Sequence, residues 1–176
     1  MFEQRKRRKA IEQAPDLIAT TPDGAIARIT GIVRVHDKTL LAPASGRICV
    51  VYALDVIDMA PTEGSWQAES RFETVDAIAF AIDNCIIDSV FVALVDIEAE
   101  PIEQLSELWD DYCLDRGLQA GAVREAIIEP GERVTVVGMV ERRIVPAGLE
   151  SGYRESGASV ALVGDFDHPV LIARAG

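Results

Sequence analysis

The sequence has few of the residues that build metal centres or disulfide frameworks. Its 176 residues include only three cysteines and two histidines. Cys49, Cys85 and Cys113 are an odd number without a short metal-ligand spacing, which predicts buried, reduced thiols. His36 and His168 have no third ligand suggested by the sequence, so neither a metal site nor any other cofactor is expected.

Long apolar runs are also lacking. No stretch of about 18 uncharged apolar residues occurs, so no transmembrane helix is expected. The longest apolar segment, residues 85–97, is interrupted by Asp88 and Asp96. The basic N-terminal residues are followed by Ala-Ile-Glu-Gln-Ala-Pro-Asp, which is no signal-peptide core. We therefore expect a cytoplasmic protein.

Acidic residues predominate, and the charge is unevenly distributed. The formal net charge is −12, but residues 1–9 hold five basic side chains against one acidic one. The remaining residues hold 12 of the 17 basic and 28 of the 29 acidic side chains, a net charge of −16. Such a body repels phosphate backbones, so no nucleic-acid binding is expected. The basic residues of the arm are Arg5, Lys6, Arg7, Arg8 and Lys9.

The composition is that of one folded domain. Apolar residues make up 49% of the chain and charged residues 26%. We divide the chain into a basic N-terminal arm, residues 1–20, and a single domain, residues 21–176. Residues 3–14 of the arm are expected to form a short basic helix that ends at Pro15, with Ile11 as almost its only apolar contact.

Most of the domain has the two-residue alternation of β-strands. Residues 25–35 alternate, with one small or apolar face that we expect to line the core: Ala27, Ile29, Gly31, Val33 and Val35. Residues 47–58 are apolar on both faces, as in a strand covered on both sides. Residues 133–142 alternate after Glu-Pro-Gly-Glu, which suits a type II turn. About eight or nine strands are predicted, as in a small β-barrel.

One segment has the helical period instead. Gly117 stands where a helix cap is expected, after apolar residues at three- and four-residue steps: Ile102, Leu105, Leu108, Trp109 and Tyr112. This pattern predicts one amphipathic helical insertion over about residues 98–116, packed on the barrel.

Two segments and their order resemble a known family. The first is residues 40–52, Leu-Leu-Ala-Pro-Ala-Ser-Gly-Arg-Ile-Cys-Val-Val-Tyr, and the second is residues 124–138, Arg-Glu-Ala-Ile-Ile-Glu-Pro-Gly-Glu-Arg-Val-Thr-Val-Val-Gly. Three shorter segments accompany them: Ala-Arg-Ile-Thr-Gly before the first, Phe-Ala-Ile-Asp-Asn between the two, and Pro-Val-Leu-Ile after the second. With these segments in this order, residues 25–173 resemble the GIDE-type domain. That domain, also called the beside-a-membrane domain, occurs in a mitochondrial outer-membrane ubiquitin ligase and in many uncharacterised bacterial proteins.

The resemblance implies a mainly β, OB-like barrel with a helical insertion. It also implies an interaction or sensing role rather than catalysis, because catalysis in the ligase belongs to a RING finger and this sequence has no Cys/His array for one. Many relatives place the domain between transmembrane helices. Here the basic residues from Arg5 to Lys9 are the candidate contact with a membrane surface or a partner.

The first functional hypothesis is a non-catalytic module that binds a protein partner or another copy of itself. Its expected contact elements are the loops at residues 40–46 and 146–157, and residues 169–173 are expected to be an exposed edge strand. Ser45, Gly46 and Arg47 are candidates for binding an anion or a peptide carboxylate. The alternative reading is a tight entry to a strand, with Arg47 solvated or paired to an acid.

Two other hypotheses stay open. The first is general acid–base catalysis, as in a hydrolase, or binding of a small ligand or cation, by a group of acids: Asp55, Asp58, Glu73, Asp76 and Asp83. It requires raised pKa values for two of these acids in one cleft. The other is single-stranded nucleic-acid binding by aromatics over a basic groove, with these candidates: Tyr52, Trp66, Phe72, Phe80 and Phe91.

Overall fold

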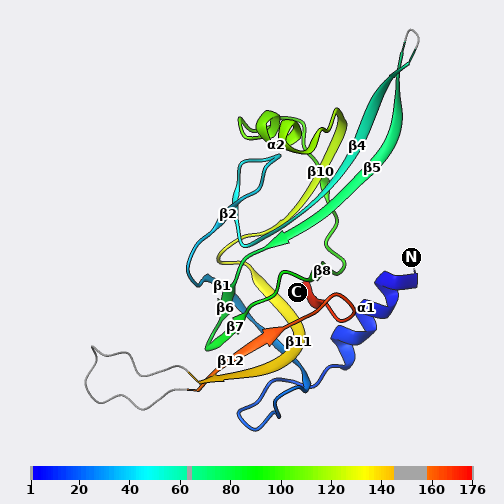
Figure 1. The fold of residues 1–176 in the computed structure, drawn as a ribbon. Helices are drawn as coiled ribbons and strands as arrows, with labels where there is room; N and C mark the ends of the chain where they lie inside the picture. The colour runs from blue at the N-terminus through cyan, green and yellow to red at the C-terminus, as the bar shows by residue number, and fades with distance from the viewer. Residues whose placement is uncertain (1, 63–64, 145–157, 176) are drawn as a thin grey trace.

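A closed barrel of five strands forms the base of the molecule (Figure 1). The computed structural model describes residues 2–62, 65–144 and 158–175. The barrel closes because β1 pairs with both β6 and β11. The predicted mainly β, OB-like barrel is therefore confirmed. Its strands are β1 (Ile26–Val35), β6 (Phe80–Ile82), β7 (Cys85–Ile87), β11 (Arg133–Ile144) and β12 (Ala158–Val163).

Strand β11 organises the barrel because three strands pair with it. Its first half pairs with β1 and with β13 (Val170–Arg174), and its second half pairs with β12. Strand β13 in turn runs parallel to β8 (Val92–Leu94). The expectation that residues 169–173 form an exposed edge is wrong, because β13 lies between β11 and β8. Its pairing with a strand far upstream leaves no signal in the local sequence.

The barrel core follows from the alternation of its strands. On β1, Ala27 and Val33 are buried as expected, whereas Val35 at the end of the strand is 44% exposed. Gly31 is required between them, because a Cβ at this position would lie 2.6 Å from Cγ2 of Ile82. The absence of a side chain lets β1 and β6 approach closely. The other fully buried large residues include Phe80, Ile87, Ile128, Leu162 and Ile172.

A second sheet extends from the barrel and carries the long β4–β5 hairpin (Figure 1). Its strand order is β5-β4-β10-β9, with β4 at Val51–Thr62, β5 at Ser65–Ala77, β10 at Ala120–Ile128 and β9 at Glu100–Pro101. Two short strands, β2 (Leu40–Leu41) and β3 (Ile48–Cys49), pair with each other at the base of the hairpin. The face of this sheet that carries Tyr52, Leu54 and Val56 is buried.

Helix α2 (Trp109–Arg116) covers that buried face. It ends as predicted at Gly117, which has a left-handed φ of 65°. The predicted start near residue 98 is wrong, because residues 100–101 form β9 and the amide of Ile102 donates to the carbonyl of Val123. Pro101 lacks an N–H and disfavours helical geometry in the residue before it, so the chain stays extended there.

Helix α1 (Phe2–Gln13) confirms the predicted basic helix and packs on the barrel beside β11 (Figure 1). Ile11 and Ala14 are buried against Val95, Val137 and Leu171. At the C-terminal end of the helix, Arg28 of β1 donates to the last-turn carbonyls and to Asp16: to Ile11 O and Glu12 O at 3.4 Å and to Asp16 Oδ1 at 2.7 Å. Of the helices in the described ranges, none is long and apolar enough to cross a membrane.

Candidate functional site

The loop that holds the predicted anion site is folded into the molecule. Ala42, Pro43 and Ala44 are buried, so the expectation that residues 40–46 form an exposed contact element is wrong for most of that loop. The amides of Ala44 and Ser45 donate to the carboxylate of Glu125 at 3.0 and 3.2 Å. Glu125 is only 5% exposed. An acid of this chain thus occupies the place where an external anion would bind.

The other groups of the predicted site also have partners within the chain. The amide of Gly46 donates to the carbonyl of Ala42 at 2.8 Å. The guanidinium of Arg47 pairs with Glu129, with Nε 3.2 Å from Oε1. The turn at residues 45–47 is thus a tight entry to a strand, with Arg47 paired to an acid, as the alternative interpretation of the sequence predicts. The other predicted contact loop, residues 146–157, lies outside the described residues.

Glu125 is the residue that the sequence reasoning missed. It stands in the apolar strand β10 and points at a loop 81 positions away. An acidic residue inside an apolar strand is costly to bury unless it accepts hydrogen bonds, and that is the signal in the sequence. Ser106 holds the same loop, because its hydroxyl donates to the carbonyl of Pro43 at 2.6 Å.

The candidate acids whose side chains the structure describes do not form an acid–base pair. Asp55 and Glu73 line a polar groove of about 470 Å³ on one face of the β4–β5 hairpin. Nε of Arg71 lies between them, 2.7 Å from Asp55 Oδ1 and 3.0 Å from Glu73 Oε1. The hydrogen bond from Arg71 lowers the pKa of Asp55. General acid–base catalysis near neutral pH needs the opposite shift.

The remaining acids lie elsewhere. Asp76 accepts a hydrogen bond from the hydroxyl of Tyr52, on the sheet face that α2 covers. Asp83 lies in the turn between β6 and β7, with a φ of 51°. The side chain of Asp58 is outside the described residues. Of the four acids whose side chains the structure describes, Asp55 and Glu73 are therefore paired with a cation, and Asp76 and Asp83 lie apart from that pair.

The aromatic candidates whose side chains the structure describes do not form one stacking surface. Phe80 is 1% exposed in the barrel core, and Tyr52 is buried under α2. Phe72, opposite Val56, is partly buried against the cluster that includes Tyr52, whereas Phe91, directly before β8, is 42% exposed. The side chain of Trp66 lies outside the described residues. The aromatic rings that the structure describes therefore do not line one groove on which the bases of a nucleic acid could stack.

Two of the three thiols, those of Cys49 and Cys85, are buried as predicted and are poor nucleophiles, whereas Cys113 is only partly buried. Burial raises the pKa of Cys49 to about 12 and that of Cys85 to about 11. Both side chains are buried. Within the described ranges, no group of three or more His, Cys, Asp or Glu side chains is placed to hold a metal ion.

The basic residues of α1 divide into paired and unpaired cations. Arg7 pairs with Glu3 at 3.4 Å, and Arg8 pairs with Asp96 near the barrel. Among the residues that the structure describes, Arg5, Lys6 and Lys9 have no ion-pair partner. Unpaired cations on a body that is otherwise strongly acidic mark α1 as the surface that attracts anions.

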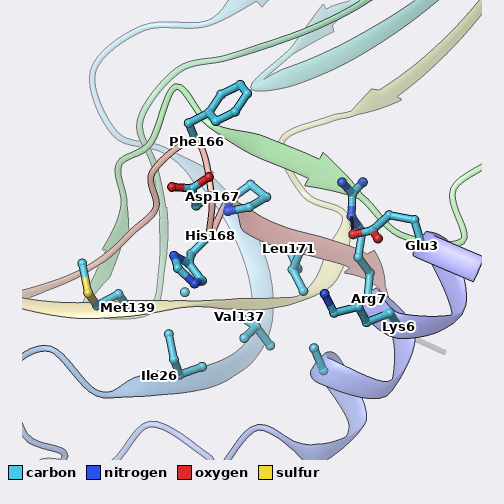
Figure 2. A pocket seen from close by; sticks show the side chains of 13 residues that line it. Glu3, Lys6, Arg7, Ile26, Val137, Met139, Phe166, Asp167, His168 and Leu171 are labelled. Carbon is cyan, nitrogen blue, oxygen red and sulfur yellow. Dashed lines mark ion pairs between the residues drawn. The ribbon is translucent and has the colours of Figure 1, made fainter.

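A cleft of about 450 Å³ lies between the part of α1 that carries Glu3, Lys6 and Arg7 and the barrel (Figure 2). Its floor is apolar and comes from β11 and β13, with Val137 and Leu171 buried and Met139 37% exposed. Its α1 wall carries Lys6, which reaches toward Val137 and Leu171 in Figure 2. The size and the mix of an apolar floor with a few charged groups are typical of ligand sites.

The opposite wall of the cleft is the loop between β12 and β13. Its Phe166 is 82% exposed and meets Phe91 edge to face, with ring centroids 6.3 Å apart. The loop is closed by Asp165, whose Oδ1 accepts the amide of His168 at 2.7 Å. This hydrogen bond lowers the pKa of Asp165. The cleft therefore has an apolar floor, an exposed aromatic rim, the unpaired ammonium of Lys6, the Arg7–Glu3 ion pair and the carboxylate of Asp167.

The chain was compared with protein-family models, with curated proteins and with solved structures, and none of the three comparisons gives a match. The similarity of residues 25–173 to the GIDE-type domain stays a prediction.

Proposed function

We propose that this protein is a non-catalytic binding module of the GIDE-like type. Its cleft between α1 and the barrel takes an acidic segment of a protein partner, with an apolar side chain of that segment on the floor of Val137, Met139 and Leu171. The observation that carries the proposal is the unpaired ammonium of Lys6 above this apolar floor (Figure 2).

Charge supports an acidic partner. The body outside residues 1–9 has a net charge of −16, so an anionic segment is repelled from most of the surface and attracted to α1. The low pKa of Asp55 and the raised pKa values of Cys49 and Cys85 favour binding over acid–base or thiol catalysis. The resemblance to the GIDE-type domain supports the same role.

Labelled peptides test the proposal directly. Fluorescence anisotropy is measured with a panel in which Leu or Phe is flanked by Glu, and with a matched panel in which the flanks are Lys. We expect the acidic panel to bind and the binding to weaken as salt is added. Lys6→Glu should weaken binding roughly tenfold, because an attraction in the cleft becomes a repulsion. Phe166→Ala should also weaken it, without affecting the fold, because Phe166 is 82% exposed.

Lys9→Glu is the matched control. It makes the same charge change on the same helix, but Lys9 does not line the cleft. Equal losses for Lys6→Glu and Lys9→Glu would argue for a diffuse electrostatic surface instead of the cleft. Vesicles containing anionic lipid form a second arm of the experiment. Binding to vesicles that depends on Arg5 and Lys9, without binding to any peptide, would assign α1 to a membrane surface and reject the peptide site.

A further inference from the structure

Strand β5 lies at the free edge of the second sheet (Figure 1). In the part of the chain that the structure describes, 12 of its 13 residues pair with β4 on one side, and no strand pairs with it on the other. A long edge strand presents a row of unpaired main-chain donors and acceptors. Such an edge is a template for a further strand.

The main-chain groups that point outward can be identified from one hydrogen bond. The amide of Ile78 donates to the carbonyl of Val50 at 3.0 Å, at the base of the β4–β5 ladder. Hydrogen-bonded and non-hydrogen-bonded pairs alternate along an antiparallel ladder. Every second residue back from Ile78 therefore bonds to β4, and these residues include Thr74 and Phe72. The N–H and C=O groups of the residues that alternate with them, Arg71, Glu73 and Val75, point away from β4.

The side chains at this edge are self-complementary. Arg71 and Glu73 are 63% and 64% exposed and lie on the same face, two residues apart. If a second copy of β5 runs antiparallel about a two-fold axis at Phe72, each Arg71 faces the Glu73 of the other copy. The two Phe72 rings then face each other on the opposite side of the sheet. Opposite charges and aromatic pairs directly across two strands are stabilising.

Neighbouring registers are unfavourable. An axis at Arg71 places arginine opposite arginine, and an axis at Glu73 places glutamate opposite glutamate, so like charges disfavour both. Arg71 also has a donor to spare. Its Nε and Nη2 donate to Asp55, and among the described residues its Nη1 has no partner. This leaves Nη1 for the carboxylate of the second copy.

We infer that two copies of this chain associate through β5, antiparallel about Phe72. The pairing joins two four-stranded sheets into one continuous sheet of eight strands. The interface has two-fold symmetry and closes on itself, so it yields a dimer rather than a filament. It does not involve the cleft beside α1, and neither proposal depends on the other.

Sedimentation velocity on the full chain, from low to high micromolar concentration, tests the dimer. The wild-type chain should show a concentration-dependent dimer. Glu73→Arg should weaken it roughly tenfold or more, because two attractive pairs become repulsive. The fold should be retained, since Asp55 is opposite Glu73 in the ladder and an arginine there meets a carboxylate. The charge swap Arg71→Glu/Glu73→Arg should restore the dimer.

Two further variants complete the experiment. Glu103→Arg makes the same charge change at an exposed site before α2 and should leave the dimer unchanged. Val75→Pro removes an outward-pointing N–H without removing a hydrogen bond to β4, so it should weaken the dimer while the chain stays folded by circular dichroism. A wild-type chain that stays monomeric at every concentration would overturn the inference. A dimer that neither Glu73→Arg nor Val75→Pro weakens, or that the folded charge-swap chain fails to restore, would overturn it too.

Discussion

Oε1 of Glu125 accepts the backbone amide of Ala44 at 3.0 Å, although the two residues are 81 positions apart. Its Oε2 accepts the amide of Ser45 at 3.2 Å. Glu125→Ala leaves both amides without this acceptor in a site that is nearly closed to water. We expect the free energy of unfolding to fall by about 2–4 kcal/mol in urea denaturation.

Glu125→Gln is the control for that prediction. The amide side chain keeps one oxygen acceptor and the same shape, so its loss of stability should be smaller than that of the alanine variant. Equal unfolding free energies for the two variants would mean that the hydrogen bonds to the loop contribute little.

Gly164 lies under the loop that forms one wall of the cleft. A Cβ there would lie 2.5 Å from the amide nitrogen of Val170 and 2.8 Å from the carbonyl oxygen of His168. Backbone atoms cannot rotate away, so Gly164→Ala should lower the melting temperature more than Gly31→Ala, whose clash is with the Ile82 side chain. The Gly31→Ala loss should itself be about 1–3 kcal/mol, as for other overpacked cores. Thermal melts of both variants check the order, and a reversed order would contradict it.

Asp96 should titrate below its ordinary range. The hydrogen bond and the charge of Arg8 lower the pKa of Asp96 in the folded chain. The ion pair therefore stabilises the fold above the unfolded pKa of about 3.9, and that contribution is lost as pH falls through the lower folded pKa. Arg8→Gln should raise the pKa of Asp96 toward its ordinary value, as measured by NMR titration of the carboxyl carbon. The same pKa in both chains would show that α1 does not hold Arg8 against the barrel in solution.

Cys49 and Cys85 should resist alkylation in the folded chain. Their pKa values are raised to about 12 and about 11 by burial, so little thiolate is present at neutral pH. Iodoacetamide followed by mass spectrometry should modify these two residues only after denaturant is added. Rapid modification of either residue in the native chain would contradict the described packing.

Local patterns in the sequence are enough to predict the mainly β character, strands such as β1, β4 and β11, the basic helix and the end of α2 at Gly117. The expected count of eight or nine strands is too low, because the described residues form 13, several of them only two or three residues long. The alternation of polar and apolar residues and the left-handed conformation of a glycine depend on a few neighbouring residues. Both can therefore be recognised within a single segment of the sequence. The start of α2 near residue 98 is predicted wrongly, because the apolar spacing from Ile102 onward is helical although Pro101 disfavours a helix there. In the structure the backbone there pairs with β10 instead.

The site was less predictable because its parts come from distant segments. Ser45, Gly46 and Arg47 form a polar turn in the sequence, but their donors are used within the chain. Glu125 accepts the Ser45 amide, the carbonyl of Ala42 accepts the Gly46 amide, and Glu129 accepts the Arg47 guanidinium. The cleft combines Lys6 of α1 with Met139 of β11 and Phe166 of the β12–β13 loop. No local pattern links these residues, and only the closure of the barrel places them together.

The pairing of β1 with β11 also sets the order in which a nascent chain can fold. Ile26 pairs with Met139, and the register continues to Ile32 and Arg133. A ribosome adds about 5–20 residues per second, so β1 waits for several seconds before its partner has been made. During that interval its hydrophobic residues are exposed, and contacts between such distant segments form slowly. This chain is therefore expected to need chaperone protection until β11 has left the ribosome.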